Sequence, residues 1–156
     1  MKKSKRLDPL IKVARQRERR LAGGLKKSME RCFAHELQVA QLNTYRTQYR
    51  TALLPGQGEL SARQLKDLWH FIGTLDEAIA QGTRRAAQSR EQYGRDQQTF
   101  MTARTRTKVL EGLLSRYKLE ERKAEVRREH KEHDENAQRM AAHGRFTKGH
   151  RDSSKG

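Results

Sequence analysis

Apolar and small residues recur along the first third of the chain at alternating spacings of three and four. Such a stripe is typical of a helix that packs along a narrow seam, because a seven-residue repeat turns one helix face toward a partner. Glu18, His35 and Arg46 interrupt the stripe. The pattern predicts a first helix over about 9–54. The members of its stripe are Ile11, Ala14, Leu21, Leu25, Ser28, Cys32, Val39, Leu42, Tyr49 and Leu53.

Proline and glycine set the expected bounds of this helix. Asp8-Pro9 is a suitable N-cap followed by proline at the first helical position, where a missing N–H has no consequence. At the other end, the segment 54–58 (LPGQG) stops the helix, because proline restricts its predecessor and glycine permits a tight reversal. We expect the turn over 55–60.

A second stripe with the same period follows the reversal. Ser61 and Gln64 fit a capping box, in which each side chain bonds the backbone N–H of the other residue. Asp96 and Glu121 interrupt this stripe. The pattern predicts a second helix over about 61–140. Its seam residues are Leu65, Leu68, Ile72, Leu75, Ile79, Gly82, Ala86, Ser89, Tyr93, Phe100, Ala103, Thr107, Leu110, Leu114, Tyr117 and Ala124.

Each stripe requires a partner, and the other stripe supplies it. A strict heptad repeat keeps its seam in place only by supercoiling around a second helix. We therefore expect an all-α fold, a long two-helix antiparallel coiled-coil hairpin that forms a single domain over 1–140. A fold at Gln57 pairs Tyr49 with Leu68, Leu42 with Leu75, Val39 with Ile79, His35 with Gly82, Cys32 with Ala86 and Ser28 with Ser89. The last three layers contain small side chains and predict a thin, compliant waist.

The second helix is expected to overhang the first. At 1.5 Å per residue, helices of roughly 45 and 80 residues span about 67 and 120 Å. Leu113, Leu114, Tyr117 and Leu119 would then lie where the first helix runs out, and an external partner or a second copy should cover them. Residues 141–156 lack a period, and we expect a disordered basic tail there.

Composition and charge narrow the possible functions. With 33% apolar and 35% charged residues, the chain is too polar for a thick core. Residues 1–31 carry +9 from 12 basic and three acidic residues, whereas 32–83 carry −1 from four and five. The basic end should therefore be attracted to an acidic surface. A merely solvated basic face and nucleic-acid binding are the alternatives. We expect no nucleic acid, because no such fold is recognisable and the aromatic residues lie in or beside the seams.

Catalytic and metal-binding patterns are weak. His130 and His133, beside Glu129 and Asp134, are spaced like ligands on one helix face, but no second cluster completes a zinc site. A two-helix hairpin also has no water-excluded interior for a substrate. We expect no enzyme activity, cofactor or metal. The single Cys32 and the absence of a membrane-spanning apolar run indicate a cytoplasmic protein.

Three segments stand out within the two helices: 38–50 (QVAQLNTYRTQYR), 71–79 (FIGTLDEAI) and 129–139 (EHKEHDENAQR). Together they resemble the family of the flagellar export protein FliJ, although Asn136 stands where the family often has an aromatic residue. The resemblance extends from about Leu10 to Met140. The equivalent stalk of a virulence type III secretion system remains an alternative.

The resemblance implies a non-enzymatic stalk in flagellar type III export. The implied partners are the hexameric flagellar export ATPase, the membrane export-gate protein and export chaperones. The protein would be cytoplasmic, and these partners would hold it at the cytoplasmic side of the inner membrane. The resemblance also implies a patch that contacts the gate protein, which we call the gate patch. Within it, Leu42, Tyr49 and Leu75 suit a role in the seam as well as a role in gate contact, whereas Tyr45, Phe71 and Ala78 lie off the seam. The gate patch comprises Gln38, Leu42, Tyr45, Tyr49, Phe71, Leu75 and Ala78.

A second set of residues follows from the stalk resemblance together with the charge count. The basic open end of the hairpin would lie inside or beneath the ATPase ring. We expect this ring-facing set to comprise Arg15, Arg19, Arg20, Leu114, Tyr117, Arg127 and Arg128.

Overall fold

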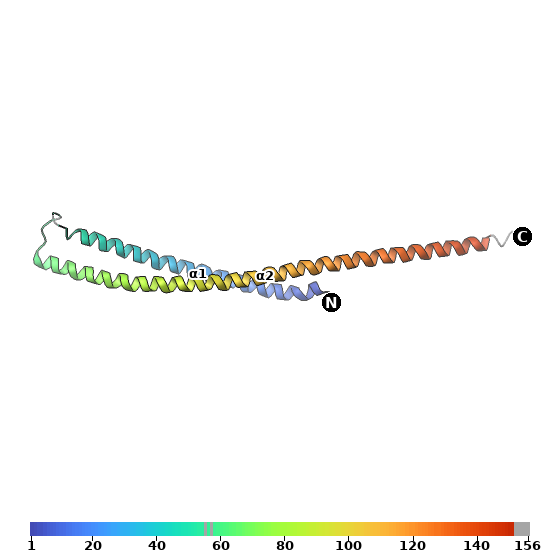
Figure 1. Ribbon diagram of the computed structural model, residues 1–156, viewed down its shortest axis with the longest axis horizontal. Helices are drawn as coiled ribbons and strands as arrows, with labels where there is room; N and C mark the ends of the chain where they lie inside the picture. The colour runs from blue at the N-terminus through green and yellow to red at the C-terminus, as the bar shows by residue number, and fades with distance from the viewer. Residues whose placement is uncertain (55, 57, 152–156) are drawn as a thin grey trace. The chain divides into compact units, whose positions relative to one another are not determined.

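Two long helices form the protein. The computed structural model describes residues 1–54, 56 and 58–151, excluding the side chains of 147–151. Helix α1 spans Lys3–Thr51 and helix α2 spans Ala62–Arg151, and the described residues contain no strand. The antiparallel all-α hairpin is therefore confirmed (Figure 1).

The chain divides into two compact units. The hairpin unit, Val13–Thr107, contains the reversal and most of α1. The terminal unit combines Met1–Lys12 with Lys108–Gly156. Each unit contains its own contacts between α1 and α2, so each is described separately. Neither helix, over its described residues, carries an apolar stretch long enough to cross a bilayer.

The predicted seam is the buried face of both helices. In the hairpin unit Cys32, Ile72 and Leu75 are among the buried residues, and the other seam residues are mostly half-buried. No described side chain is completely enclosed. Burial of apolar area provides the main stabilisation, at about 25 cal/mol per Å². It is confined here to a strip one side chain wide.

Three of the residues that interrupt the seam, Arg46, Asp96 and Glu121, have polar partners on the other helix. Arg46 Nη1 donates to Asp76 Oδ1 at 3.1 Å, and the Ser28 hydroxyl donates to Asp96. In the terminal unit Glu121 accepts hydrogen bonds from Ser4. These interactions satisfy polar groups that would otherwise destabilise the seam.

The register of the hairpin unit differs from the predicted pairing. Val39 lies against Gly82, three residues beyond its predicted partner Ile79. Tyr49 likewise contacts Phe71, three residues beyond its predicted partner Leu68. A shift of about half a heptad leaves both stripes facing each other, so the apolar period could not distinguish the two registers. Gly82 favours the observed one because its missing side chain admits Val39.

The reversal agrees with the predicted capping. The Ser61 N–H donates to Gln64 Oε1 at 3.0 Å, and the Gln64 N–H donates to Ser61 Oγ at 3.2 Å. Gly56 and Gly58 have φ of 89° and 114°, which favour glycine. The predicted turn residues 55 and 57 lie outside the described residues. In Figure 1, α2 extends past the end of α1 at the reversal, as the shifted register requires.

Helix α1 begins at Lys3, so the predicted start at Asp8-Pro9 was wrong. The Ser4 N–H and hydroxyl donate to the two carboxylate oxygens of Glu121 at 3.0 and 2.7 Å. This carboxylate caps first-turn donors that no intrahelical carbonyl can reach. Leu7 and Ile11 are also buried. These contacts offset the hydrogen bond that Pro9 cannot donate inside the helix.

The earlier start of α1 also changes the predicted overhang. In the terminal unit Leu113, Leu114 and Tyr117 are half-buried instead of uncovered, and only Leu119 among the four is exposed. From Val126 to Phe146 every side chain is exposed. An overhanging part of α2 therefore exists, but it begins later than expected.

Helix α2 continues to Arg151, which contradicts a disordered tail from residue 141 and a helix end near 140. No proline follows residue 55, and Ala141-Ala142 favour helix. A single Gly144 costs only about 1 kcal/mol relative to alanine and does not end the helix. Residues 152–156 of the predicted tail lie outside the described residues.

The close approach of Val39 to Gly82 can be tested by two alanine substitutions. Gly73→Ala should raise the free energy of unfolding by about 1 kcal/mol, since nothing lies within 4 Å of the new methyl group. Gly82→Ala should give a smaller gain or a loss, because its Cβ would lie 3.0 Å from Val39 Cγ2. Urea unfolding followed by circular dichroism measures both. Equal gains in the free energy of unfolding from Gly73→Ala and Gly82→Ala would contradict the close approach of Val39. So would a difference between the two gains that remains when Val39 is also replaced by alanine.

The Glu121 cap predicts a pH dependence of stability. The hydrogen bond from the Ser4 N–H has the largest effect on the pKa of the Glu121 carboxyl and lowers it. The hydrogen bond from the Ser4 hydroxyl lowers the same pKa further. Because this pKa is lower in the folded state, the Glu121 cap contributes fully to stability above the unfolded-state pKa of the carboxyl. The contribution is lost as the pH falls through the folded-state pKa. Glu121→Gln should therefore reduce the melting temperature at pH 6, and the difference from wild type should shrink as pH falls below 4. Glu120→Gln, an exposed neighbour, is the matched control and should not reproduce this trend.

Candidate partner-binding surfaces

The members of the predicted gate patch divide into exposed and seam residues. Tyr45, Tyr49 and Phe71 are 53%, 39% and 42% exposed. Leu75 is only 7% exposed and belongs to the seam. Leu42 and Ala78 are half-buried, while Gln38 is exposed.

An aromatic pair joins the two helices within this patch. The rings of Tyr49 and Phe71 lie 4.7 Å apart between centroids at 69° to each other, an edge-to-face contact. Residues 38, 42, 45 and 49 share one face of α1, and 71, 75 and 78 share one face of α2, since spacings of three and four align on a helix. The pair therefore brings the two predicted faces together at the reversal end of the hairpin unit.

Two flanks border the seam of the hairpin unit, one on each side. On the first, which we call the paired flank, cross-helix ion pairs form: Arg50 Nη2 lies 3.9 Å from Asp76, and Arg90 bonds Glu36. The hydrogen bond that Arg90 donates to the Glu36 carboxylate raises the pKa of the Arg90 guanidinium. The paired flank comprises Glu36, Asn43 and Arg50 of α1 and Asp76, Thr83, Arg90 and Arg104 of α2.

The opposite side, which we call the open flank, carries the off-seam members of the gate patch. Its residues recur at seven-residue intervals on each helix and include no acidic residue. The open flank comprises Arg17, Gly24, Arg31, Gln38 and Tyr45 of α1 and Phe71, Ala78, Arg85, Gln92, Thr99 and Arg106 of α2. The gate patch is thus one end of a longer surface.

The predicted ring-facing set is distributed over both units. In the hairpin unit Arg15, Arg19 and Arg20 are exposed. In the terminal unit Arg127 and Arg128 are exposed, and Arg128 lies 3.8 Å from Glu125.

Leu114 and Tyr117 are less available than their place in the set implied. Both are half-buried in the terminal unit, and the Lys3 ammonium lies 5.5 Å from the centre of the Tyr117 ring. They therefore contribute to packing against α1.

The predicted waist contains unfilled space. A cavity of about 260 Å³ lies beside Ser28, His35 and Ser89. Within the described residues, His35 Nδ1 is buried without a hydrogen-bond partner. Cys32 is buried in the seam, and its Sγ lies 3.8 Å from Glu36 Oε1.

Trp69 was not predicted as a contact residue, although it is 58% exposed near the reversal. Leu54 and Leu60 are exposed in the same part of the hairpin unit. The signal that identified Phe71, an aromatic residue outside the heptad seam, applies equally to Trp69. It is the only tryptophan of the chain.

The side chains of His130 and His133 lie on the exposed part of α2 in the terminal unit. Among the residues that the structure describes, no group of three or more histidine, cysteine, aspartate or glutamate side chains could hold a metal ion.

Comparison with known proteins identifies one family. The family model described as flagellar FliJ protein matches residues 2–145. Comparison with curated proteins and with solved structures gives no significant match.

The Tyr49–Phe71 contact should be measurable as a coupling energy. We expect a double-mutant cycle of Tyr49→Ala and Phe71→Ala to give about 1 kcal/mol of coupling, the range of edge-to-face aromatic pairs. Urea unfolding of the four proteins provides the free energies. Additive effects of the two substitutions would argue against the contact.

Proposed function

The chain belongs to the FliJ family and is a component of the flagellar type III export system, and we propose that it acts as a two-helix stalk. In this proposal it binds the hexameric export ATPase, links it to the membrane export gate and escorts export chaperones. It would be located on the cytoplasmic side of the inner membrane, held there through its partners.

The half-exposed aromatic pair is the observation that carries the gate contact. Tyr49 and Phe71 stabilise each other at 4.7 Å, yet each keeps about two fifths of its surface exposed. Rigid aromatic side chains of this kind are common centres of binding energy, because little conformational entropy is lost when they are covered. The surrounding segment 32–83 has almost no net charge, which lowers the cost of removing water.

The exposures assign different roles within the gate patch. Tyr45 and Phe71 would touch the gate protein directly, with Gln38 and Ala78 beside them. Leu75 would act indirectly, since it is buried and its removal would loosen the seam beneath the patch. Leu42 shares this supporting role.

Contact with the ATPase is supported by charge. Arg15, Arg19 and Arg20 lie on the exposed surface of the hairpin unit, within a segment that carries +9 over residues 1–31. In the terminal unit Arg127 and Arg128 provide a separate basic surface. Acidic surfaces of the ring subunits would be attracted to both, and the attraction would weaken with salt.

Gate binding tests the proposed patch. Tyr45→Ala and Phe71→Ala should each weaken binding to the purified cytoplasmic part of the export-gate protein by about tenfold, as expected when an aromatic anchor is lost. Isothermal titration calorimetry gives the affinities, and circular dichroism checks that each variant remains helical.

Met101→Ala is the matched control, because this side chain is equally exposed in the hairpin unit but lies outside the patch. It should leave the affinity unchanged. Unaltered binding by both aromatic variants would exclude the patch as the gate contact.

The ATPase contact predicts stimulation that depends on charge. The wild-type chain should increase the hydrolysis rate of the flagellar export ATPase, and the triple variant Arg15→Ala, Arg19→Ala, Arg20→Ala should lose most of this effect. Raising the salt concentration should weaken the wild-type stimulation more than that of the triple variant. Stimulation of a virulence secretion ATPase but not of the flagellar one would favour the virulence stalk. Failure to stimulate either, with tight and steeply salt-dependent binding to RNA, would favour a nucleic-acid binder.

A further inference from the structure

Four arginines on the open flank have no acidic partner. Arg17 and Arg31 lie on α1, and Arg85 and Arg106 lie on α2. None of them forms an ion pair or hydrogen bond with the described residues. The paired flank contrasts with this, because there Glu36 and Asp76 neutralise arginines of the other helix. The difference between the flanks leaves four positive charges on one side of the hairpin unit.

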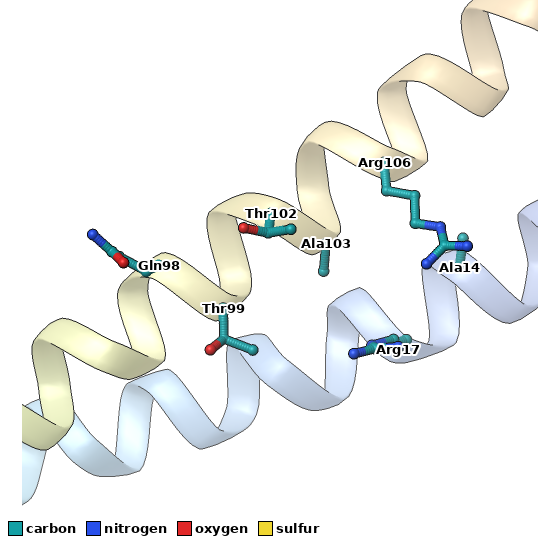
Figure 2. A pocket seen from close by; sticks show the side chains of 7 residues that line it. All are labelled: Ala14, Arg17, Gln98, Thr99, Thr102, Ala103 and Arg106. Carbon is teal, nitrogen blue, oxygen red and sulfur yellow. The ribbon is translucent and has the colours of Figure 1, made fainter.

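The first pair of arginines borders a groove between the helices. Arg17 of α1 and Arg106 of α2 line a cavity of about 340 Å³ whose floor is formed by Ala14 and Ala103 (Figure 2). The methyl-bearing side chain of Thr99 completes it from α2. Small side chains create the space, and two guanidinium groups border it from opposite helices.

The second pair repeats this arrangement at the waist. Arg31 and Arg85 line the cavity of about 260 Å³ that also touches Ser28 and Ser89. The nearby carboxylate of Asp96 is already engaged, since it accepts hydrogen bonds from Ser28 and Gln92. Fourteen residues separate Arg17 from Arg31, which corresponds to about 21 Å along α1. On α2, 21 residues separate Arg85 from Arg106, or about 31 Å. Two basic grooves thus lie on the same flank, and their arginines are closer together on α1 than on α2.

Carboxylates of a protein fit these grooves better than phosphates of a nucleic acid. A guanidinium binds a carboxylate through two parallel hydrogen bonds, and the apolar floor of the first groove suits the methylene groups of glutamate. Neither groove is lined by phenylalanine, tyrosine or tryptophan, the larger platforms on which bases stack. The charges also come as two separate pairs instead of a continuous basic track.

We infer that the open flank is a docking surface for an acidic helix of a partner protein, whose glutamate or aspartate side chains enter the Arg17–Arg106 and Arg31–Arg85 grooves. In a helical partner, acidic residues about fourteen positions apart would match the separation of about 21 Å between Arg17 and Arg31 along α1. On α1 this surface adjoins Arg20, which is assigned above to the ATPase and lies three residues from Arg17, and it shares its flank with the gate patch.

A designed peptide tests the inference without any export protein. The probe is a fluorescein-labelled helical peptide with two glutamate pairs fourteen residues apart, and its reference is the same peptide with glutamine at those positions. Fluorescence anisotropy should show that the wild-type chain binds the glutamate peptide at least tenfold more tightly. A third peptide, with the glutamate pairs only seven residues apart, should bind more weakly than the first.

Charge-matched variants locate the binding. Arg17→Ala/Arg106→Ala and Arg31→Ala/Arg85→Ala should each weaken binding of the glutamate peptide about tenfold. Lys26→Ala/Arg104→Ala removes the same charge from other faces of the hairpin unit and should change the affinity less than twofold. Circular dichroism confirms that each variant is folded.

Three results would overturn the inference. One is equal binding of the glutamate and glutamine peptides, and another is an equal loss in all three double variants, which would indicate attraction by net charge alone. The third is tighter binding of a single-stranded RNA than of the peptide, with the RNA affinity dependent on Arg17 and Arg106. Because the assay contains neither ATPase nor gate protein, its failure would leave the proposed stalk function to be decided by the experiments above.

Discussion

The two helices meet along a seam one side chain wide. The partners of its polar positions fix the register of the helices and thereby the chemistry of the two flanks. A heptad stripe can slide by half a repeat and still face its counterpart. The observed register places Val39 over Gly82 and brings Arg46 to Asp76. Both interactions are specific to this alignment, since one needs a residue without a side chain and the other needs opposite charges.

The flanks follow from that register. With Arg50 opposite Asp76 and Glu36 opposite Arg90, the paired flank has ion pairs between the two helices. On the other flank Tyr45 and Phe71 are followed along the hairpin unit only by glutamine, small residues and arginine. An antiparallel hairpin whose helices share one heptad period therefore has two chemically different sides. A slide of half a repeat would remove the ion pairs between the helices that distinguish the paired flank from the open flank.

The sequence predicted what depends on periodicity and missed what depends on individual contacts. The seam, the reversal with its Ser61–Gln64 capping box and the off-seam placement of Phe71 follow from spacing and turn chemistry, and all are present. The start of α1 was missed because Pro9 is a strong local signal, and it is overridden by Glu121, which lies more than a hundred residues away in sequence. The register and the pairing of arginines across the helices were missed for the same reason.

The distribution of carboxylates explains why so basic a chain can be both a stable hairpin and a binding surface. Asp76, Asp96 and Glu36 bond the opposite helix in the hairpin unit, and Glu121 does so in the terminal unit. These acids lie in or beside the seam, where a hydrogen bond or an opposite charge lowers the cost of burying a carboxylate. The four arginines without partners among the described residues lie on the open flank, where they border the two grooves. In the proposed docking their carboxylates come from a partner protein, because the acids nearest to the seam already bond the opposite helix.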